Sequence, residues 1–155
     1  MLPSLPANEG ERLAALRGLG ILDTPSEERF DRITRTAQRV FGVPIAMISL
    51  IDVNRQWYKS CQGLDQHEAP RDVSFCAHAL TMTKPLIIQD ALNDPRFISN
   101  PFVIGAPYVR FYAGQQLRSP EGYVYGTLCI LDTVPHTFSD EDSLGAGRSG
   151  ALGRE

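Results

Sequence analysis

Residues 109–132 read VRFYAGQQLRSPEGYVYGTLCILD, two apolar runs on either side of a short polar segment, Ser119-Pro120-Glu121-Gly122. Proline favours the second position of a tight turn, and glycine readily supplies the positive φ that such turns need at their end. The stretch therefore predicts a β-hairpin with a bulge at Gly122. Because large apolar side chains occur at both odd and even positions, we expect this hairpin to be covered on both faces.

The turn also sets an expected register for the hairpin. If Ser119 faces Tyr123, then Arg110 lies opposite Asp132 and forms a favourable cross-strand pair. One face then carries Phe111, Ala113, Gln115 and Leu117 together with Leu131, Cys129, Thr127 and Tyr125. The other face carries Tyr112, Gly114, Gln116 and Arg118 together with Ile130, Leu128, Gly126 and Val124. A slip of one residue would mix these faces.

Composition places the chain among globular proteins of one domain. It has 155 residues, 43% hydrophobic and 21% charged, with a net charge of −3. Charges of both signs are interspersed, so we expect no nucleic-acid partner. No apolar run approaches the roughly 18 residues that span a membrane, and the start lacks a secretory pattern. Three cysteines are too few for a disulfide framework and are spaced unlike a zinc site, which predicts a cytoplasmic protein.

Helical signals precede the first strands. Asn8 and Glu11 start a short helix with a leucine stripe (Leu13, Leu16 and Leu19) that could pack on its own domain or on a second copy. Thr24-Pro25-Ser26-Glu27 is a stronger start, for an amphipathic helix that ends at Gly42. Residues 44–52 and 55–60 then predict two strands, the second nearer an edge.

Residues 63–108, which we call the flap, are cut into short pieces by five prolines. We expect a helix over 74–82, a strand over 86–88 and one helical turn over 94–97. Long irregular segments inside a compact domain are usually functional. This one carries many apolar side chains, so we expect it to fold over one sheet face and to leave a cavity for a small ligand.

These patterns divide the chain into a flexible arm (1–7), a domain (8–142) and a glycine-rich tail (143–155). Ser139 resembles a helix start, whereas the glycines after it disfavour a helix.

The order of elements resembles a GAF domain of the kind found N-terminal in bacterial sensor histidine kinases and diguanylate cyclases. The resemblance rests on NEGERLAALRGLGILDTPSEERFDRITRTAQRVFGVPIAMISLID, RQWYKS, RDVSFCAHAL, NDPRF and VRFYAGQQLRSPEGYVYGTLCILD. It implies an α/β protein of the α+β type with a central antiparallel sheet of five or six strands. Terminal helices, which often form a homodimer, would cover one face, and the ligand pocket would lie on the other. The long final helix of such sensors is broken here by glycines after Ser139.

Cys76 and His78 are the most suggestive chemical group. They could form a thiolate–imidazole pair, but a buried cysteine is more often structural, and two ligands do not make a zinc site. We therefore predict no catalytic residue and no metal. The bilin and cyclic-nucleotide signatures of other GAF domains are absent, so no cofactor is expected.

The leading hypothesis is a non-catalytic sensory module that binds an unidentified small molecule between flap and sheet. One alternative is a thiol-based reductase of a small oxidised metabolite, which needs two cysteines within disulfide reach. Another is a ligand-free dimerisation scaffold. For the pocket, the sequence predicts Trp57, Phe75, Cys76, Asp90, Asp94, Phe97, Phe111 and Tyr112. Asp94 also suits a capping role.

Overall fold

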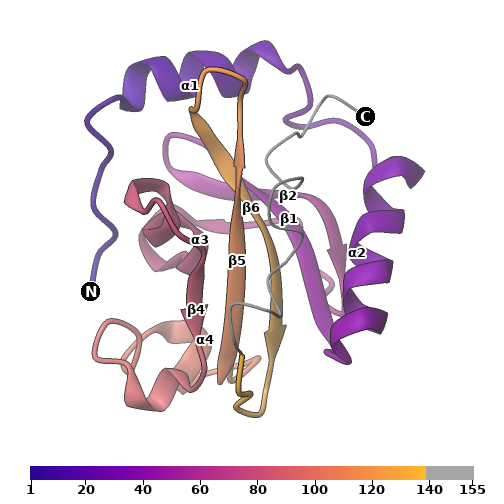
Figure 1. Cartoon of the computed structure of the whole chain (residues 1–155), viewed down its shortest axis with the longest axis vertical. Coiled ribbons are helices and arrows are strands. Elements are labelled where there is room, and N and C mark those ends of the chain that lie inside the picture. Colours follow the sequence, from indigo (N-terminus) through magenta and orange to yellow (C-terminus); the bar gives the residue numbers. More distant parts are fainter. Residues whose placement is uncertain (139–155) are drawn as a thin grey trace.

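A six-stranded antiparallel sheet forms the centre of the protein in the computed structural model, which describes residues 1–138 (Figure 1). The strand order is β3-β2-β1-β6-β5-β4. The strands are β1 (Ile45–Ile51), β2 (Arg55–Gln62), β3 (Glu68–Pro70), β4 (Leu86–Ile88), β5 (Phe111–Arg118) and β6 (Val124–Asp132). The expected sheet and its antiparallel pairing are confirmed, and β2 lies one strand from the edge.

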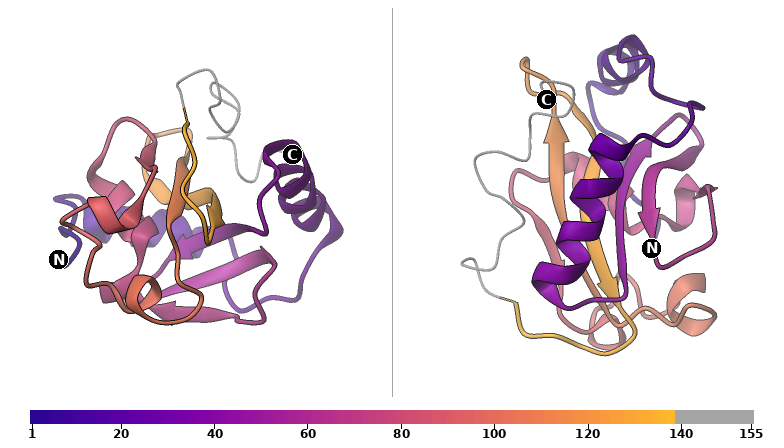
Figure 2. Two further views of the ribbon diagram at one scale, coloured as in Figure 1. Left: turned by 90° about the horizontal axis from the view of Figure 1, so that it is seen from below. Right: turned by 90° about the vertical axis from the view of Figure 1, so that its right-hand side faces the viewer.

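Helices and flap cover opposite faces of this sheet. In Figure 2, α2 (Glu28–Phe41) lies along one face, and the flap with its two short helices lies on the other. The flap helices are α3 (Phe75–His78) and α4 (Pro101–Ile104). α1 (Glu9–Gly18) packs on the α2 side, where Leu16 joins a cluster with Phe30. Among residues 1–138, no helix is long and apolar enough to cross a membrane.

The start of α2 differs from the prediction, whereas its end agrees. The helix begins at Glu28, because Thr24 is held in the preceding loop: its hydroxyl donates to the Ile21 carbonyl and accepts from Lys59 Nζ at 2.7 Å. At the other end Gly42 has φ 64° and closes the helix in the left-handed conformation, as expected.

The β5–β6 hairpin has the predicted turn but a different register beyond it. Ser119 N–H donates to the Tyr123 carbonyl at 2.8 Å, and Arg118 pairs with Val124, as expected. A bulge follows, so that Leu117 pairs with Gly126, and every later pair is shifted by one residue.

Because of the bulge, both predicted faces of the hairpin are wrong beyond Arg118. Tyr112, Gly114 and Gln116 now lie beside Leu131, Cys129 and Thr127 on the flap side. The predicted side-chain pair of Arg110 and Asp132 is also wrong. The Arg110 guanidinium donates to the Val103 carbonyl at 3.0 Å, while the Asp132 carboxylate binds His136 at 2.6 Å.

Most short elements of the flap form where the sequence predicts them. The strand over 86–88 is β4, and the helix over 74–82 consists of α3 followed by a 3-10 turn, Ala79–Thr81. Residues 94–97 form a single hydrogen-bonded turn. β3 and α4 were not predicted, because segments of three or four residues carry no periodicity.

One buried side chain ties the end of the α3 segment to the sheet. The Gln116 amide on β5 donates to the carbonyls of Ala79 at 3.2 Å, Met82 at 3.3 Å and Lys84 at 2.7 Å.

α1 is bound to its own domain through a buried arginine. Arg12 is 1% exposed and donates to the carbonyls of Val124 at 3.1 Å and Ile51 at 2.7 Å. Glu9 pairs with Arg12 at 2.9 Å and with Arg71 at 2.6 Å. Since Leu16 is also fully buried, part of the leucine stripe proposed for a dimer packs inside the domain. The expected helix start at Ser139 and the tail lie outside the described residues.

A substitution at Gly126 tests how closely β6 approaches β1. A Cβ atom at this position would meet the backbone carbonyl of Ser49, whereas a Cβ at Gly10, on α1, would meet open space. We expect Gly126→Ala to lower the free energy of unfolding by about 2–3 kcal/mol. The control, Gly10→Ala, should leave it unchanged or raise it by about 0.5–1 kcal/mol. Urea unfolding measures both, and equal effects would contradict this packing.

Glu9 should make stability depend on pH. Burial raises its pKa, but hydrogen bonds and charge from Arg12 and Arg71 outweigh burial and lower the pKa from 4.5 to about 2. A lowered pKa stabilises the fold above about pH 4.5, and this contribution is lost as the pH falls towards 2.

Urea unfolding across this range tests the effect. Glu9→Gln should cost on the order of 2 kcal/mol near neutral pH and progressively less in acid. Glu11→Gln, exposed on the same helix, serves as the control. A cost that does not change with pH would contradict the charge-based explanation.

Candidate functional site

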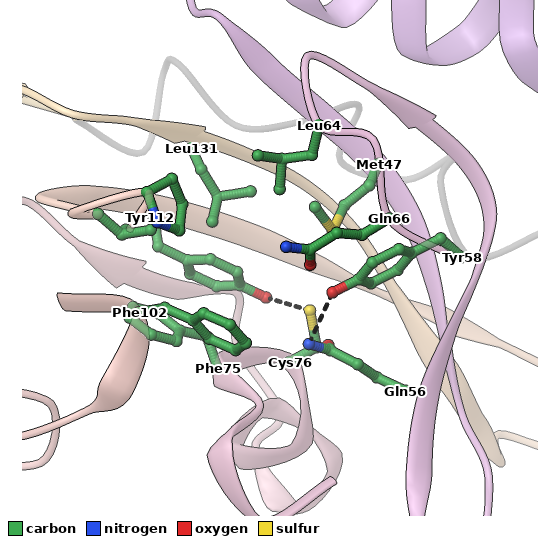
Figure 3. Close-up of a pocket in the computed structure, with 12 residues that line it drawn as sticks. Met47, Gln56, Tyr58, Leu64, Gln66, Phe75, Cys76, Phe102, Tyr112 and Leu131 are labelled. Carbon is green, nitrogen blue, oxygen red and sulfur yellow. Dashed lines mark hydrogen bonds between the residues drawn. The ribbon is translucent and has the colours of Figure 1, made fainter. Parts of the chain in front are cut away.

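A narrow pocket lies between the flap and the sheet (Figure 3). Its cavity volume is about 30 Å³, room for roughly one or two water molecules. The walls are mostly apolar, and the polar atoms gather at one end. The lining residues are Met47, Gln56, Tyr58, Leu64, Gln66, Phe75, Cys76, Phe102, Pro107, Val109, Tyr112 and Leu131.

The strands position the pocket floor by simple alternation. Successive side chains of a strand point to opposite faces, so Gln56 and Tyr58 on β2 point to the flap while Trp57 points to α2. Tyr112 on β5 and Leu131 on β6 are direct partners in the ladder and complete the floor. The flap supplies the opposing wall through Phe75 and Cys76 of α3 (Figure 3).

Three of the eight predicted pocket residues line this cavity: Phe75, Cys76 and Tyr112. Phe97 lies directly behind them, where its ring stacks on Phe75 with centroids 4.5 Å apart. The cavity lies between flap and sheet as expected, but it is far smaller than the ligand-sized cavity that the sequence predicted, and Phe97 supports its wall without lining it.

The other predicted residues lie elsewhere, for reasons that the structure makes plain. Trp57 packs with Phe30 on the α2 side, because it alternates with the two pocket residues of β2. Phe111 is on that side as well, in a cluster with Ala37, because it is next to Tyr112 in β5 and consecutive side chains of a strand point to opposite faces.

The two aspartates are capping residues. Asp90 accepts from the Leu92 N–H at 3.1 Å, and Asp94 accepts from the Arg96 N–H at 3.0 Å. Asp94 also pairs with the Arg96 guanidinium at 2.7 Å, and that hydrogen bond holds the pKa of its carboxyl below the usual value. Neither carboxylate lines the pocket.

Sequence reasoning missed the polar end of the pocket. Gln56 and Tyr58 alternate with Trp57 in a strand next to the centre of the sheet, and two polar groups at that spacing were the available signal. Leu64, Gln66 and Pro107 reach the pocket from irregular loops, which carry no periodic pattern.

Gln56 organises a buried polar network beneath α3. Its amide oxygen accepts from Ser49 Oγ at 3.1 Å and from Ser74 Oγ at 2.8 Å, and its amide nitrogen donates to the Tyr58 hydroxyl at 3.0 Å. Ser74 in turn accepts from the Ala77 N–H at 3.1 Å and caps α3. The network therefore fixes both the tyrosine and the helix that carries Cys76.

Two cysteines meet where Cys76 lines the pocket, with Cys129 behind it. The Sγ atoms of Cys76 and Cys129 are 3.8 Å apart, and the two residues are 2% and 0% exposed. The Tyr112 hydroxyl donates to Cys76 Sγ at 3.2 Å. His78 instead packs edge-on against Phe97, with centroids 4.7 Å apart. Residues 1–138 hold no cluster of three or more side chains suited to bind a metal.

The two thiols differ in acidity. Burial raises the pKa of Cys76, but hydrogen bonds from the side chains of Cys129, Thr127, Tyr112 and Ser49 outweigh it and hold the pKa below that of a free thiol. Burial and the neighbouring Cys76 raise the pKa of Cys129. Burial likewise raises the pKa of Cys61 to about 11. The hydrogen-bond donors around Cys76 therefore favour its thiolate form.

The family model of the GAF domain matches residues 25–144. The chain belongs to the GAF family. A cyclic di-GMP phosphodiesterase of Pseudomonas aeruginosa is 42% identical over 133 residues. The match covers 86% of this chain but only 23% of that enzyme, so the chain spans less than a quarter of its relative.

Solved GAF structures share the fold at low sequence identity. The GAF domain of an Acinetobacter phosphoenolpyruvate-protein phosphotransferase aligns with a TM-score of 0.59 and 18% identity, over 85% of this chain and 83% of that one. A free methionine-R-sulfoxide reductase of Neisseria meningitidis, solved with its substrate, aligns with a TM-score of 0.62 and 16% identity, over 98% and 89% of the two chains. Both the family and the fold implied by the sequence are therefore confirmed.

The Gln56 network yields a stability test of the GAF pocket. Gln56→Met keeps a similar volume but leaves the buried Ser49 and Ser74 hydroxyls without their acceptor. We expect a loss of about 2–3 kcal/mol in the free energy of unfolding. Gln66→Met, at an exposed pocket residue, is the control and should change stability by less than about 0.5 kcal/mol. Urea unfolding measures both changes. Similar losses in the two variants would show that the Gln56 network does not contribute to the free energy of unfolding.

Proposed function

We propose that this GAF domain is a non-catalytic sensor module of a bacterial signal-transduction protein and that it binds a small molecule between flap and sheet. The observation that carries the proposal is the pocket itself. It is a concavity on the flap face that shares the apolar walls and few polar groups of small-molecule sites, but at about 30 Å³ it is roughly tenfold smaller than they usually are.

The lining favours a small aromatic or aliphatic molecule with one hydrogen-bonding end. Phe75, Phe102 and Leu131 offer apolar contact, and the Gln56 amide and Tyr58 hydroxyl lie at the polar end (Figure 3). Because the cavity holds only about 30 Å³, a ligand larger than a few atoms requires the flap to move outward. Phe102, from the flap, is half-buried among the wall residues.

The relative suggests the signalling context. We propose that the parent protein acts in cyclic di-GMP turnover, with this domain regulating a phosphodiesterase, in place of the histidine kinase or diguanylate cyclase that the resemblance implied. The 42% identity to the Pseudomonas aeruginosa enzyme supports this proposal.

A thiol-based reductase is the second candidate, because Cys76 and Cys129 meet the proximity that it requires. Against it, a metabolite would have to reach two buried sulfur atoms through a cavity of about 30 Å³. Incubation with free methionine sulfoxide and dithiothreitol tests it directly. We expect no turnover, and multiple turnovers lost in Cys76→Ser would establish the enzyme instead.

The dimerisation scaffold has less support, because it relies on the leucine stripe of α1. Leu16 from that stripe is fully buried within the same chain. Its test is the oligomeric state of the chain in solution, and a dimer weakened by Leu13→Glu would favour the scaffold.

Small aromatic probes test the sensor pocket. We expect phenol, indole or benzoate at a hundredfold excess over Kd to stabilise the chain by about 2.7 kcal/mol. For a domain of this size, that raises Tm by roughly 5–10 °C.

Two leucines of β6 provide matched variants. Leu131→Phe fills the pocket and should abolish the rise in Tm, whereas Leu128→Phe makes the same change on the α2 side and should preserve it. No rise with any probe, or an equal rise in both variants, would contradict binding in this pocket.

A further inference from the structure

The contact between Cys76 and Cys129 joins two elements that are distant in sequence. Cys76 lies on α3 in the flap, and Cys129 lies on β6 in the middle of the sheet, 53 positions further along the chain. Their sulfur atoms are 3.8 Å apart, so a disulfide of about 2.05 Å requires them to approach by less than 2 Å. The two residues are free cysteines here.

The third cysteine is held too far from Cys129 to form a disulfide with it. Cys61 on β2 and Cys129 on β6 both pair with Met47 of β1, from its two sides. Two strand spacings of about 4.8 Å therefore separate them, beyond the roughly 7 Å limit between Cα atoms for a disulfide. Cys61 Sγ contacts the Leu64 carbonyl at 3.7 Å instead.

The surroundings of Cys76 favour a reactive sulfur. The Tyr112 hydroxyl donates to Cys76 Sγ at 3.2 Å, and that hydroxyl also lies 3.4 Å from Thr127 Oγ1. Hydrogen-bond donors stabilise a thiolate, which is the nucleophilic form of cysteine. The second thiol, Cys129, stands where a resolving cysteine would be needed.

The cavity selects the oxidant by size. Cys76 lines the pocket, and the cavity has room for roughly one or two water molecules. Hydrogen peroxide, with two heavy atoms, fits this space, whereas bulky disulfides and most oxidised metabolites do not.

We propose that Cys76 and Cys129 are a peroxide-oxidised dithiol, with Cys76 as the reacting thiol and Cys129 as the resolving thiol. This inference goes beyond the proposed ligand and does not depend on it. Its product is a covalent link between the flap and the central strand of the sheet.

Peroxide oxidises the thiol pair in two steps. The Cys76 thiolate attacks one peroxide oxygen, an S–O bond forms, the O–O bond breaks, and the departing hydroxide takes up the proton that the thiol released. This step gives a sulfenic acid and water. The Cys129 sulfur then attacks the Cys76 sulfur, and the S–S bond forms as the S–O bond breaks. The departing hydroxide takes up the Cys129 proton and becomes a second water. The two thiols are oxidised by two electrons, and one peroxide is reduced to two waters.

Peroxide titration of the intact chain tests the proposal. After oxidation and alkylation under denaturing conditions, we expect mass spectrometry to find a species lighter by two hydrogens, with a Cys76–Cys129 peptide pair. Cys61 should still be a free thiol and so be found alkylated. It should oxidise more slowly than Cys76, by at least on the order of tenfold, as expected of a thiol with a raised pKa. Dithiothreitol should restore both thiols.

Three variants assign the roles. Cys129→Ser should leave a sulfenic acid on Cys76 that dimedone traps once the chain is unfolded, Cys76→Ser should leave Cys129 unoxidised, and Cys61→Ser should behave as wild type. Tyr112→Phe removes the donor to Cys76 and should slow oxidation while the disulfide still forms.

The wild-type chain alone can overturn the proposal, so it does not depend on a variant that fails to fold. Oxidation of Cys61 before Cys76, disulfides only between chains, or thiols that survive excess peroxide would each do so. None of these results bears on the probe-binding test of the sensor pocket.

Discussion

The pairing of β1 with β6 is the constraint on which the rest of the molecule depends. β1 is buried along its whole length and β6 along most of its length, so their backbone groups must be satisfied by each other and by the outer strands. Gly126 allows β6 to approach the Ser49 carbonyl of β1 at this junction. α2 then covers one face of the central pair and the flap covers the other (Figure 2). The pocket exists because the flap is irregular where α2 is regular.

The sequence predicted the type and place of most elements, since apolar composition and turn residues act locally. Predictions of strand register and of the face to which a side chain points were wrong where they depended on the assembled sheet. The β5–β6 register was right at Ser119 and Tyr123, but a bulge one pair later shifted the rest. In β2, Trp57 was preferred to its neighbours, although which face of a strand meets the flap is settled only when both layers are in place. Asp94 was recognised as a capping residue and serves as one.

The same bulge explains why the sequence could not place the thiol pair. In the unbulged register, Cys129 would lie on the face of Phe111, opposite Tyr112. The extra residue on β6 brings Cys129 to the side of Tyr112, where both meet Cys76 from the flap. A single inserted residue in one strand therefore determines which side chains surround the pocket floor.

The pocket wall around α3 is fastened to the sheet at both ends by glutamine side chains. Ser74, at its start, binds Gln56 of β2, and the carbonyls of Ala79, Met82 and Lys84, at its end, bind Gln116 of β5. Because these amides are buried, the wall cannot open while the strands stay closed without leaving polar groups unsatisfied. Backbone amide protons of α3 should therefore exchange with deuterium together with those of the neighbouring strands. The wall and the sheet behave as one cooperative unit, so any displacement of α3 acts directly on β2 and β5.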